Sequence, residues 1–252
     1  MRAWSHAILV CMMNVTTAMC SAPPSLVRCA SVTTLDFFGS CATLGAPSQS
    51  NLGGLGPDSG AEELRFPRIA VQSSGVAIDL VITVASGSTY QGTPTANGCF
   101  NSNQYMKLSV ARSRSVTFDF TLRDAATNAP VTLTAFNLVA LDIDQQSTSI
   151  REVISVSGHA AYDLDASTHL TVGGTASTPT FTSTQRNVDN PTDPRALTTA
   201  QQRSSVNFVF ADTSTWQMTF SVTGGSPSGS RNAFFGGASN MVEACPPLPP
   251  SP

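Results

Sequence analysis

Hydrophobic and polar positions alternate most regularly between Ser115 and Glu152. In residues 116–123 every second residue is apolar, which predicts a strand with one buried and one solvated face. Residues 124–130 are rich in turn formers and end in a proline, so a turn is expected there. Residues 136–144 are apolar on both faces through their middle. This segment is therefore predicted to be a central strand that is covered, at least in part, on both sides.

Shorter extended patterns, separated by turn-forming residues, fill the rest of the chain. These further strands are expected at residues 32–38, 65–72, 76–85, 105–110, 150–157, 161–164, 169–172, 180–184 and 232–236. Two more, at 206–210 and 216–222, are predicted to form a hairpin through residues 212–215. One short helix is predicted near 194–202, because Asp193 suits the cap and Pro194 the first helical position. The pattern predicts an all-β protein, an antiparallel β-sandwich or jelly roll.

The two ends of the sequence depart from this pattern. Residues 1–20 combine a basic start with a short apolar run and small residues near its end, which predicts a signal peptide. No later segment approaches the roughly 18 apolar residues of a membrane-spanning helix, so no span is expected after signal removal. The proline-rich residues 244–252 are expected to form an extended tail. A single β-sandwich domain is therefore predicted for residues 30–240 of a secreted or cell-surface protein.

The charge and the cysteine content indicate which partners and which cellular compartment are expected for this protein. The formal net charge of −3 gives no basic footprint, so nucleic acid is not expected as a partner. Four cysteines follow the predicted signal peptide, namely Cys29, Cys41, Cys99 and Cys245. An even number in an exported chain predicts two disulfides, with free or intermolecular thiols as the alternative. Cys29 and Cys41 flank the first predicted strand, which favours a local bridge and leaves Cys99 with Cys245.

An acidic group lies at the end of the predicted central strand. Asp142 and Asp144 would share one strand face, about 7 Å apart, and Glu152 would return close to them after a polar connection. Carboxylates at this spacing repel one another, and a hard cation such as calcium would relieve that repulsion. The three residues are therefore a candidate calcium site. The alternative is a solvated strand end whose carboxylates pair with Arg123 or Arg151.

Motifs of several enzyme classes are missing from the sequence. It contains no phosphate-binding loop, no G-x-S-x-G nucleophile elbow and no H-E-x-x-H zinc motif. The alternating segment 140–144 is superficially similar to the catalytic strand of concanavalin-like glycosidases. However, Ala140 stands where the nucleophile would be, and Asp144 stands where a glutamic acid would be. An EF-hand that begins at Asp142 is excluded, because its sixth residue would be Ser147 instead of glycine.

From Leu35 to Gly236 the chain resembles a family of extracellular β-sandwich modules of unassigned function. The similarity lies in residues 51–58, 77–81, 118–120, 130–133, 141–144 and 231–235. It implies an exported surface or matrix protein with no known catalytic residue.

The leading hypothesis is a non-enzymatic extracellular binding or adhesion module, carbohydrate-binding and calcium-stabilised, with a glycan or a cell-surface or matrix component as its partner. Long polar loops suggest Asp58, Tyr90 and Phe100 as ligand-binding candidates. A structural coat or matrix protein is the first alternative, suggested by the Ser/Thr-rich composition and the proline-rich tail. A secreted β-sandwich glycoside hydrolase is the second.

Overall fold

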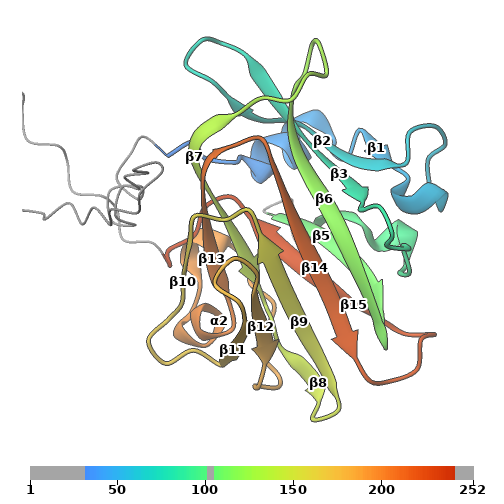
Figure 1. The fold of residues 1–252 in the computed structure, drawn as a ribbon, viewed down its shortest axis with the longest axis vertical. Coiled ribbons are helices and arrows are strands. Elements are labelled where there is room, and N and C mark those ends of the chain that lie inside the picture. The colour runs from blue at the N-terminus through green and yellow to red at the C-terminus, as the bar shows by residue number, and fades with distance from the viewer. Residues whose placement is uncertain (1–31, 101–104, 242–252) are drawn as a thin grey trace, which may run out of the picture.

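The computed structural model describes residues 32–100 and 105–241, which form two antiparallel β-sheets packed face to face (Figure 1). The nine-stranded sheet has the order β1-β2-β3-β6-β14-β9-β12-β11, and β8 pairs with β9 beside this path. The six-stranded sheet has the order β10-β13-β7-β15-β5-β4. The predicted all-β sandwich is therefore confirmed.

The nine-stranded sheet takes its strands from both halves of the chain. Their bounds are β1 Gln49–Ser50, β2 Glu63–Val71, β3 Ala77–Val84, β6 Arg114–Asp124, β8 Gln145–Ser147, β9 Ile150–Ser157, β11 Leu170–Gly174, β12 Pro179–Ser183 and β14 Thr215–Thr223. On β6 the predicted alternation holds, since Val116, Phe118, Phe120 and Leu122 are all buried.

The six-stranded sheet contains the predicted central strand. Its strands are β4 Gly98–Phe100, β5 Tyr105–Ala111, β7 Leu133–Leu141, β10 Ala161–Asp163, β13 Val206–Thr213 and β15 Ser230–Gly236. β7 lies between β13 and β15, and its residues are buried on both faces through its second half. The central position predicted for this segment is confirmed, but the strand ends at Leu141 and does not reach Asp144.

Aromatic side chains fill the space between the two sheets. Phe120 and Trp216 of the nine-stranded sheet stack with ring centroids 5.2 Å apart. Phe136 and Phe210 of the six-stranded sheet stack at 5.0 Å, and Trp216 contacts Phe210 at 4.9 Å. Each such pair adds about 0.5–1.5 kcal/mol beyond the burial of its area. The contact between Trp216 and Phe210 links the two sheets.

The prediction of a first strand at residues 32–38 is wrong. This segment forms only one isolated β-bridge, between Thr33 and Phe136. Leu35 and Phe37 are buried, as alternation requires, but Leu35 lies in irregular chain and Phe37 begins a helical turn beside β2. The chain then enters a helical turn, η1 (Gly39–Thr43), and the Asp36 side chain accepts a hydrogen bond from the Gly39 N–H at 2.9 Å. The alternation of apolar residues in this short segment therefore correctly indicates which side chains are buried, but it does not indicate a strand.

The predicted hairpin between residues 206–210 and 216–222 is also wrong. β13 pairs with β7 and β10, whereas β14 pairs with β6 and β9 in the opposite sheet. The chain crosses between the sheets at Ser214, whose carbonyl accepts a hydrogen bond from the Leu122 N–H. The turn at residues 124–130 makes the same kind of crossing, from β6 to β7. A turn sequence predicts a reversal but not which sheet the next strand joins.

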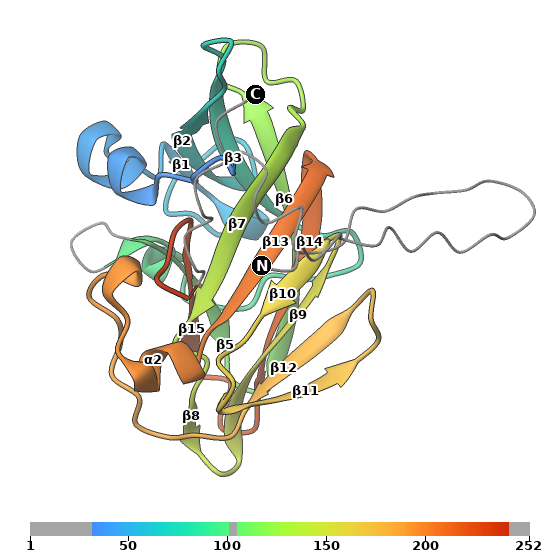
Figure 2. The ribbon, with the colours of Figure 1, turned by 90° about the vertical axis from the view of Figure 1, so that its left-hand side faces the viewer.

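The predicted helix at residues 194–202 is divided into two pieces. Asp193 caps a 3-10 turn, η4 (Pro194–Ala196), and Thr198 then starts α2 (Thr199–Arg203) with a capping box to Gln201. Between them Leu197 is extended, and it joins a second apolar cluster on the outer side of the six-stranded sheet. The members of this cluster are Tyr105, Val139, Leu141, Leu197 and Phe234. Figure 2 shows α2 beside the lower part of that sheet.

One disulfide links Cys41 of η1 to Cys99 of β4, across 58 residues of sequence. The predicted pairs Cys29–Cys41 and Cys99–Cys245 are therefore wrong, because η1 folds back onto β2 and brings Cys41 to the edge of the six-stranded sheet. Cys29 and Cys245 lie outside the described residues, as do the predicted signal peptide and proline-rich tail. Among the described residues no helix has the length and apolar character needed to cross a membrane.

Candidate functional site

The predicted acidic group is brought together, although not by a strand. β7 ends at Leu141, and Asp142 has a positive φ of 56°, which breaks the alternation on which the prediction rested. Asp142, Asp144 and Glu152 are only 3%, 6% and 2% exposed. Glu152 returns on β9 as expected, and its Oε2 atom accepts a hydrogen bond from the Asp144 N–H at 3.3 Å. The alternative of a solvated strand end is therefore wrong.

Arg231 of β15 is the partner of this group. Its Nε donates to Glu152 Oε1 at 2.6 Å, and its Nη2 donates to Asp144 Oδ1. The ion pairs thus join a strand of the six-stranded sheet to β9 of the nine-stranded sheet. The arginines expected from the sequence donate elsewhere, Arg123 to the Asn128 carbonyl and Arg151 to the Thr148 carbonyl.

Burial dominates the electrostatics of the three carboxyl groups. It raises the pKa of Asp142 to about 8, with a further rise from the neighbouring Asp144 carboxylate and an opposing effect from Arg231. Burial also raises the pKa of Asp144, and it raises the pKa of Glu152 well above its usual range, in both cases against the attraction of Arg231. One guanidinium therefore does not compensate three buried carboxylates.

A cavity of about 100 Å³ opens beside this group. Asp142, Glu152 and Arg231 line it together with Asn190, Ser230 and Asn232. Two buried oxygens here, Asp142 Oδ1 and Asn232 Oδ1, have no hydrogen-bond partner among the described residues. Within those residues, no group of three or more His, Cys, Asp and Glu side chains has the geometry of a metal site. Calcium binding by Asp142, Asp144 and Glu152 stays a prediction.

The geometry gives the glycoside hydrolase alternative no support. Asp142 and Glu152 face the same cavity, but both Glu152 oxygens are occupied, by Arg231 and by the Asp144 N–H. The cavity of about 100 Å³ is also smaller than the roughly 300–1,000 Å³ that ligand pockets usually occupy.

The weaker ligand candidates do not form one surface. Tyr90 is 4% exposed, packs against Phe118 and accepts a hydrogen bond on its hydroxyl from Asn97, so its ring is part of the core. Phe100 packs on Phe234 beside the second apolar cluster. Asp58 accepts a hydrogen bond from the Ser50 N–H in an exposed loop.

A groove that the sequence reasoning missed lies at another part of the sandwich. It has a volume of about 540 Å³ and is lined by residues 32–34, 71–74 and 132–134. All ten lining residues are uncharged, and most carry hydroxyl or amide groups. Gln72 Nε2 donates to the Thr132 carbonyl at 3.3 Å, which ties the β2–β3 turn to the start of β7. The available signal was the repetition of Ser and Thr in three segments, two of which flank strands.

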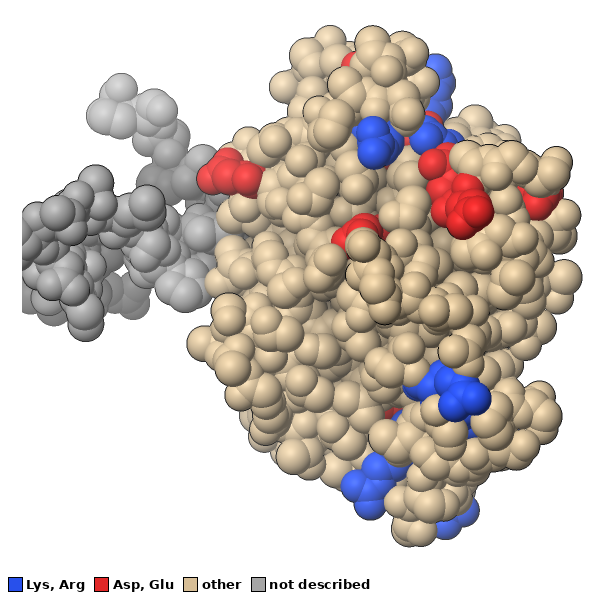
Figure 3. Space-filling view, turned by 45° about the vertical axis from the view of Figure 1, so that its right-hand side comes forward, with Lys and Arg blue, Asp and Glu red and all other residues tan. Residues whose placement is uncertain are grey.

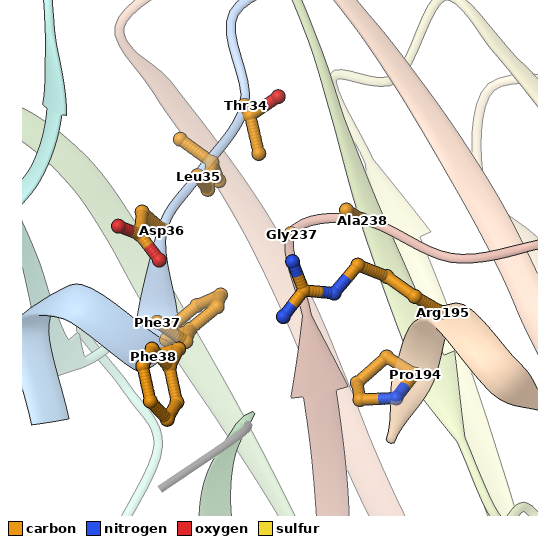
Figure 4. Close-up of a pocket in the computed structure, with 9 residues that line it drawn as sticks. All are labelled: Thr34, Leu35, Asp36, Phe37, Phe38, Pro194, Arg195, Gly237 and Ala238. Atoms are coloured by element: carbon orange, nitrogen blue, oxygen red, sulfur yellow. The ribbon is translucent and has the colours of Figure 1, made fainter. Parts of the chain in front are cut away.

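The remaining surface offers fewer features. Figure 3 shows a face on which charged side chains lie in small separate groups, with extensive uncharged surface between them. Figure 4 shows a smaller hollow of about 40 Å³ between the 34–38 segment, Pro194 and Arg195, and the chain at 237–238. This volume is small compared with the roughly 300–1,000 Å³ that ligand pockets usually occupy.

No protein-family model and no curated protein matches the chain. Several solved structures resemble it, among them the following three. The N-terminal domain of the Streptococcus gordonii adhesin Sgo0707 aligns with a TM-score of 0.47 and 11% identity, over 69% of this chain and 47% of that one. The adhesin domain of PrgB from Enterococcus faecalis aligns with a TM-score of 0.43 and 11% identity, over 71% and 64%. The glucan binding protein C of Streptococcus mutans aligns with a TM-score of 0.40 and 9% identity, over 77% and 67%. The chain thus spans about half of the first structure and about two thirds of the others.

Proposed function

We propose that the chain is a non-enzymatic extracellular binding module of the adhesion type, and that its ligand is a neutral carbohydrate. The observation that carries this proposal is the uncharged groove lined by residues 32–34, 71–74 and 132–134, with its volume of about 540 Å³. This volume lies within the range of about 300–1,000 Å³ that is usual for ligand pockets.

The lining of the groove suits a polyhydroxylated ligand without charge. Hydroxyl groups both donate and accept hydrogen bonds, and the amide of Gln72 offers a donor and an acceptor, so they can pair with sugar hydroxyls in several orientations. Val71, which is 59% exposed, supplies apolar surface for the C–H face of a sugar ring. A charged ligand would find no counter-charge among the lining residues.

The disulfide supports an extracellular location for this activity. Cys41–Cys99 bridges two segments that are far apart in the sequence, and such bridges persist mainly in oxidising compartments. A carbohydrate ligand on a cell surface or in a matrix is consistent with that location.

A glycan array with the full chain, run with calcium and with chelator, tests the proposal. Ser73→Arg places a long charged side chain in the groove from the exposed β2–β3 turn. Ser177→Arg makes the same change in the exposed β11–β12 turn and is the matched control. Wild type and Ser177→Arg are expected to bind the same glycans, and Ser73→Arg is expected to lose them. An array without hits in either condition would refute the function, and binding that survives Ser73→Arg would refute the groove as its site.

A further inference from the structure

The cavity beside Asp142 has a feature that the ion pairs with Arg231 do not explain. Asp142 is 3% exposed, and its Oδ1 atom meets no hydrogen-bond donor among the described residues. Burying a carboxyl oxygen without a partner is expensive, and native proteins nearly always provide one. The missing partner is therefore expected to be a group that enters the cavity.

The other two carboxylates are already engaged. Glu152 accepts from Arg231 and from the Asp144 N–H, while Asp144 accepts from Arg231 and from the Val188 N–H. Their charges still act on the cavity, because one arginine faces three carboxylates, and Asp189 adds a further negative field at Asp142. The carboxyl groups around the cavity therefore outnumber the one arginine that faces them.

Five of the seven residues that line the cavity carry side-chain oxygens of the kind that hard cations prefer, and the other two are Arg231 and Phe234. Asn232 Oδ1 is buried and unpartnered like Asp142 Oδ1, and Ser230 and Asn190 line the same space. Carboxylate, amide and hydroxyl oxygens with water are typical calcium ligands, whereas no sulfur or imidazole is among the lining groups. A volume of about 100 Å³ accommodates an ion with a few waters, since one water occupies about 30 Å³.

We propose that this cavity binds one calcium ion, with Asp142 Oδ1 and Asn232 Oδ1 as its direct protein ligands and water in the remaining positions. Asp144 and Glu152 are held by Arg231 and act through their charge. This site differs from the trio expected from the sequence, because only Asp142 of the three contributes a free ligand atom. It does not depend on the carbohydrate groove, which is lined by other segments.

A thermal melt of the full chain in calcium and in chelator, at matched ionic strength, tests the site. Calcium at about 100 times its dissociation constant should raise the Tm of wild type by about 5–10 °C. Asp142→Asn should lose this rise. Asp212→Asn is the matched control, because Asp212 is exposed and has a similar positive φ of 46°, so it should keep the full rise.

A second variant keeps the test decisive if Asp142→Asn folds poorly. Asn232→Asp gives the ion a second carboxylate as a direct ligand and should lower the calcium dissociation constant measured by titration calorimetry, at a stoichiometry of one ion per chain. No rise in Tm for wild type at millimolar calcium, or equal rises in Asp142→Asn and Asp212→Asn, would overturn the proposal. A rise that sodium chloride reproduces would overturn it as well, since screening alone would then explain it.

Discussion

Arg231 makes a direct prediction, because its loss leaves buried carboxylates without a counter-charge. Arg231→Met keeps a long side chain on β15 but removes both ion pairs, to Asp144 and to Glu152. Breaking a buried ion pair from one side typically lowers stability by about 3–5 kcal/mol, since the remaining charge stays buried. We expect a loss in the free energy of unfolding in that range at about pH 8 in chelator.

The loss should shrink as the pH falls. Burial already raises the pKa of both carboxyl groups in the folded protein, and removal of Arg231 takes away the main opposing effect. Groups with a raised folded-state pKa contribute stability that is complete below their unfolded pKa and is lost as the pH rises through the folded pKa. At about pH 5, one unit above the unfolded value, protonating one carboxyl costs only about 1.4 kcal/mol. Protonation at low pH should therefore restore more of the free energy of unfolding in Arg231→Met than in wild type.

Urea unfolding of wild type and Arg231→Met at these two pH values measures the effect. Arg114→Met is the control, because Arg114 is exposed and its guanidinium donates to the carbonyl of Ser113. It should change stability by less than about 1 kcal/mol at both pH values. The reasoning is refuted if Arg231→Met behaves like Arg114→Met, or if its loss of stability increases toward acid.

Three further predictions concern other contacts. Replacing Cys41 and Cys99 together by serine should lower the free energy of unfolding by up to about 4 kcal/mol, as expected for a loop of 58 residues, and reducing agent should leave the variant's urea midpoint unchanged. Gly237→Ala should lower the melting temperature strongly, because an added Cβ would lie 1.9 Å from a backbone oxygen, whereas Gly173→Ala, with nothing within 4 Å, should be nearly neutral. In chelator, Asp142→Asn should stabilise the protein by up to about 4 kcal/mol near pH 7 and by little near pH 4. The reason is that the wild-type protein, in which the pKa of Asp142 is raised to about 8, loses stability as the pH rises from 4 to 7. An equal effect at both pH values would contradict the raised pKa of Asp142.

The sequence predicted the sandwich because its strands follow strict alternation, as in β6, or continuous apolar runs, as in β7. It did not predict which strands pair. The partners of β13 and β14 lie in opposite sheets, and this is decided by crossings such as that at Ser214, where the local residues look like an ordinary hairpin turn. The disulfide was mispaired for a related reason, since sequence proximity favoured Cys29 although the fold brings Cys99 to Cys41.

The acidic group was found from the sequence through a partly mistaken argument. Strand periodicity placed Asp142 and Asp144 on one face, but the positive φ of Asp142 ends that periodicity, and the carboxylates meet because the chain turns back toward β9. Arg231 was missed, because it is 79 residues from Glu152 and only the sheet topology brings it near. A long-range ion pair of this kind leaves no local pattern in the sequence.

The acidic group and the aromatic core join the two sheets in physically different ways. Ring contacts such as that of Phe210 with Trp216 stabilise the sandwich at any pH, because they bury apolar area without charge. The ion pairs of Arg231 join the same sheets, but replacing a buried ion pair by apolar residues is often neutral or stabilising. Three carboxylates around one arginine therefore lower stability as long as nothing else enters the cavity. A bound cation would make the contribution of these groups to stability favourable. The carboxyl groups that oppose folding when no cation is bound would then provide the attraction that holds the cation. The stability of the junction between the sheets would then depend on the ion, whereas the core would not.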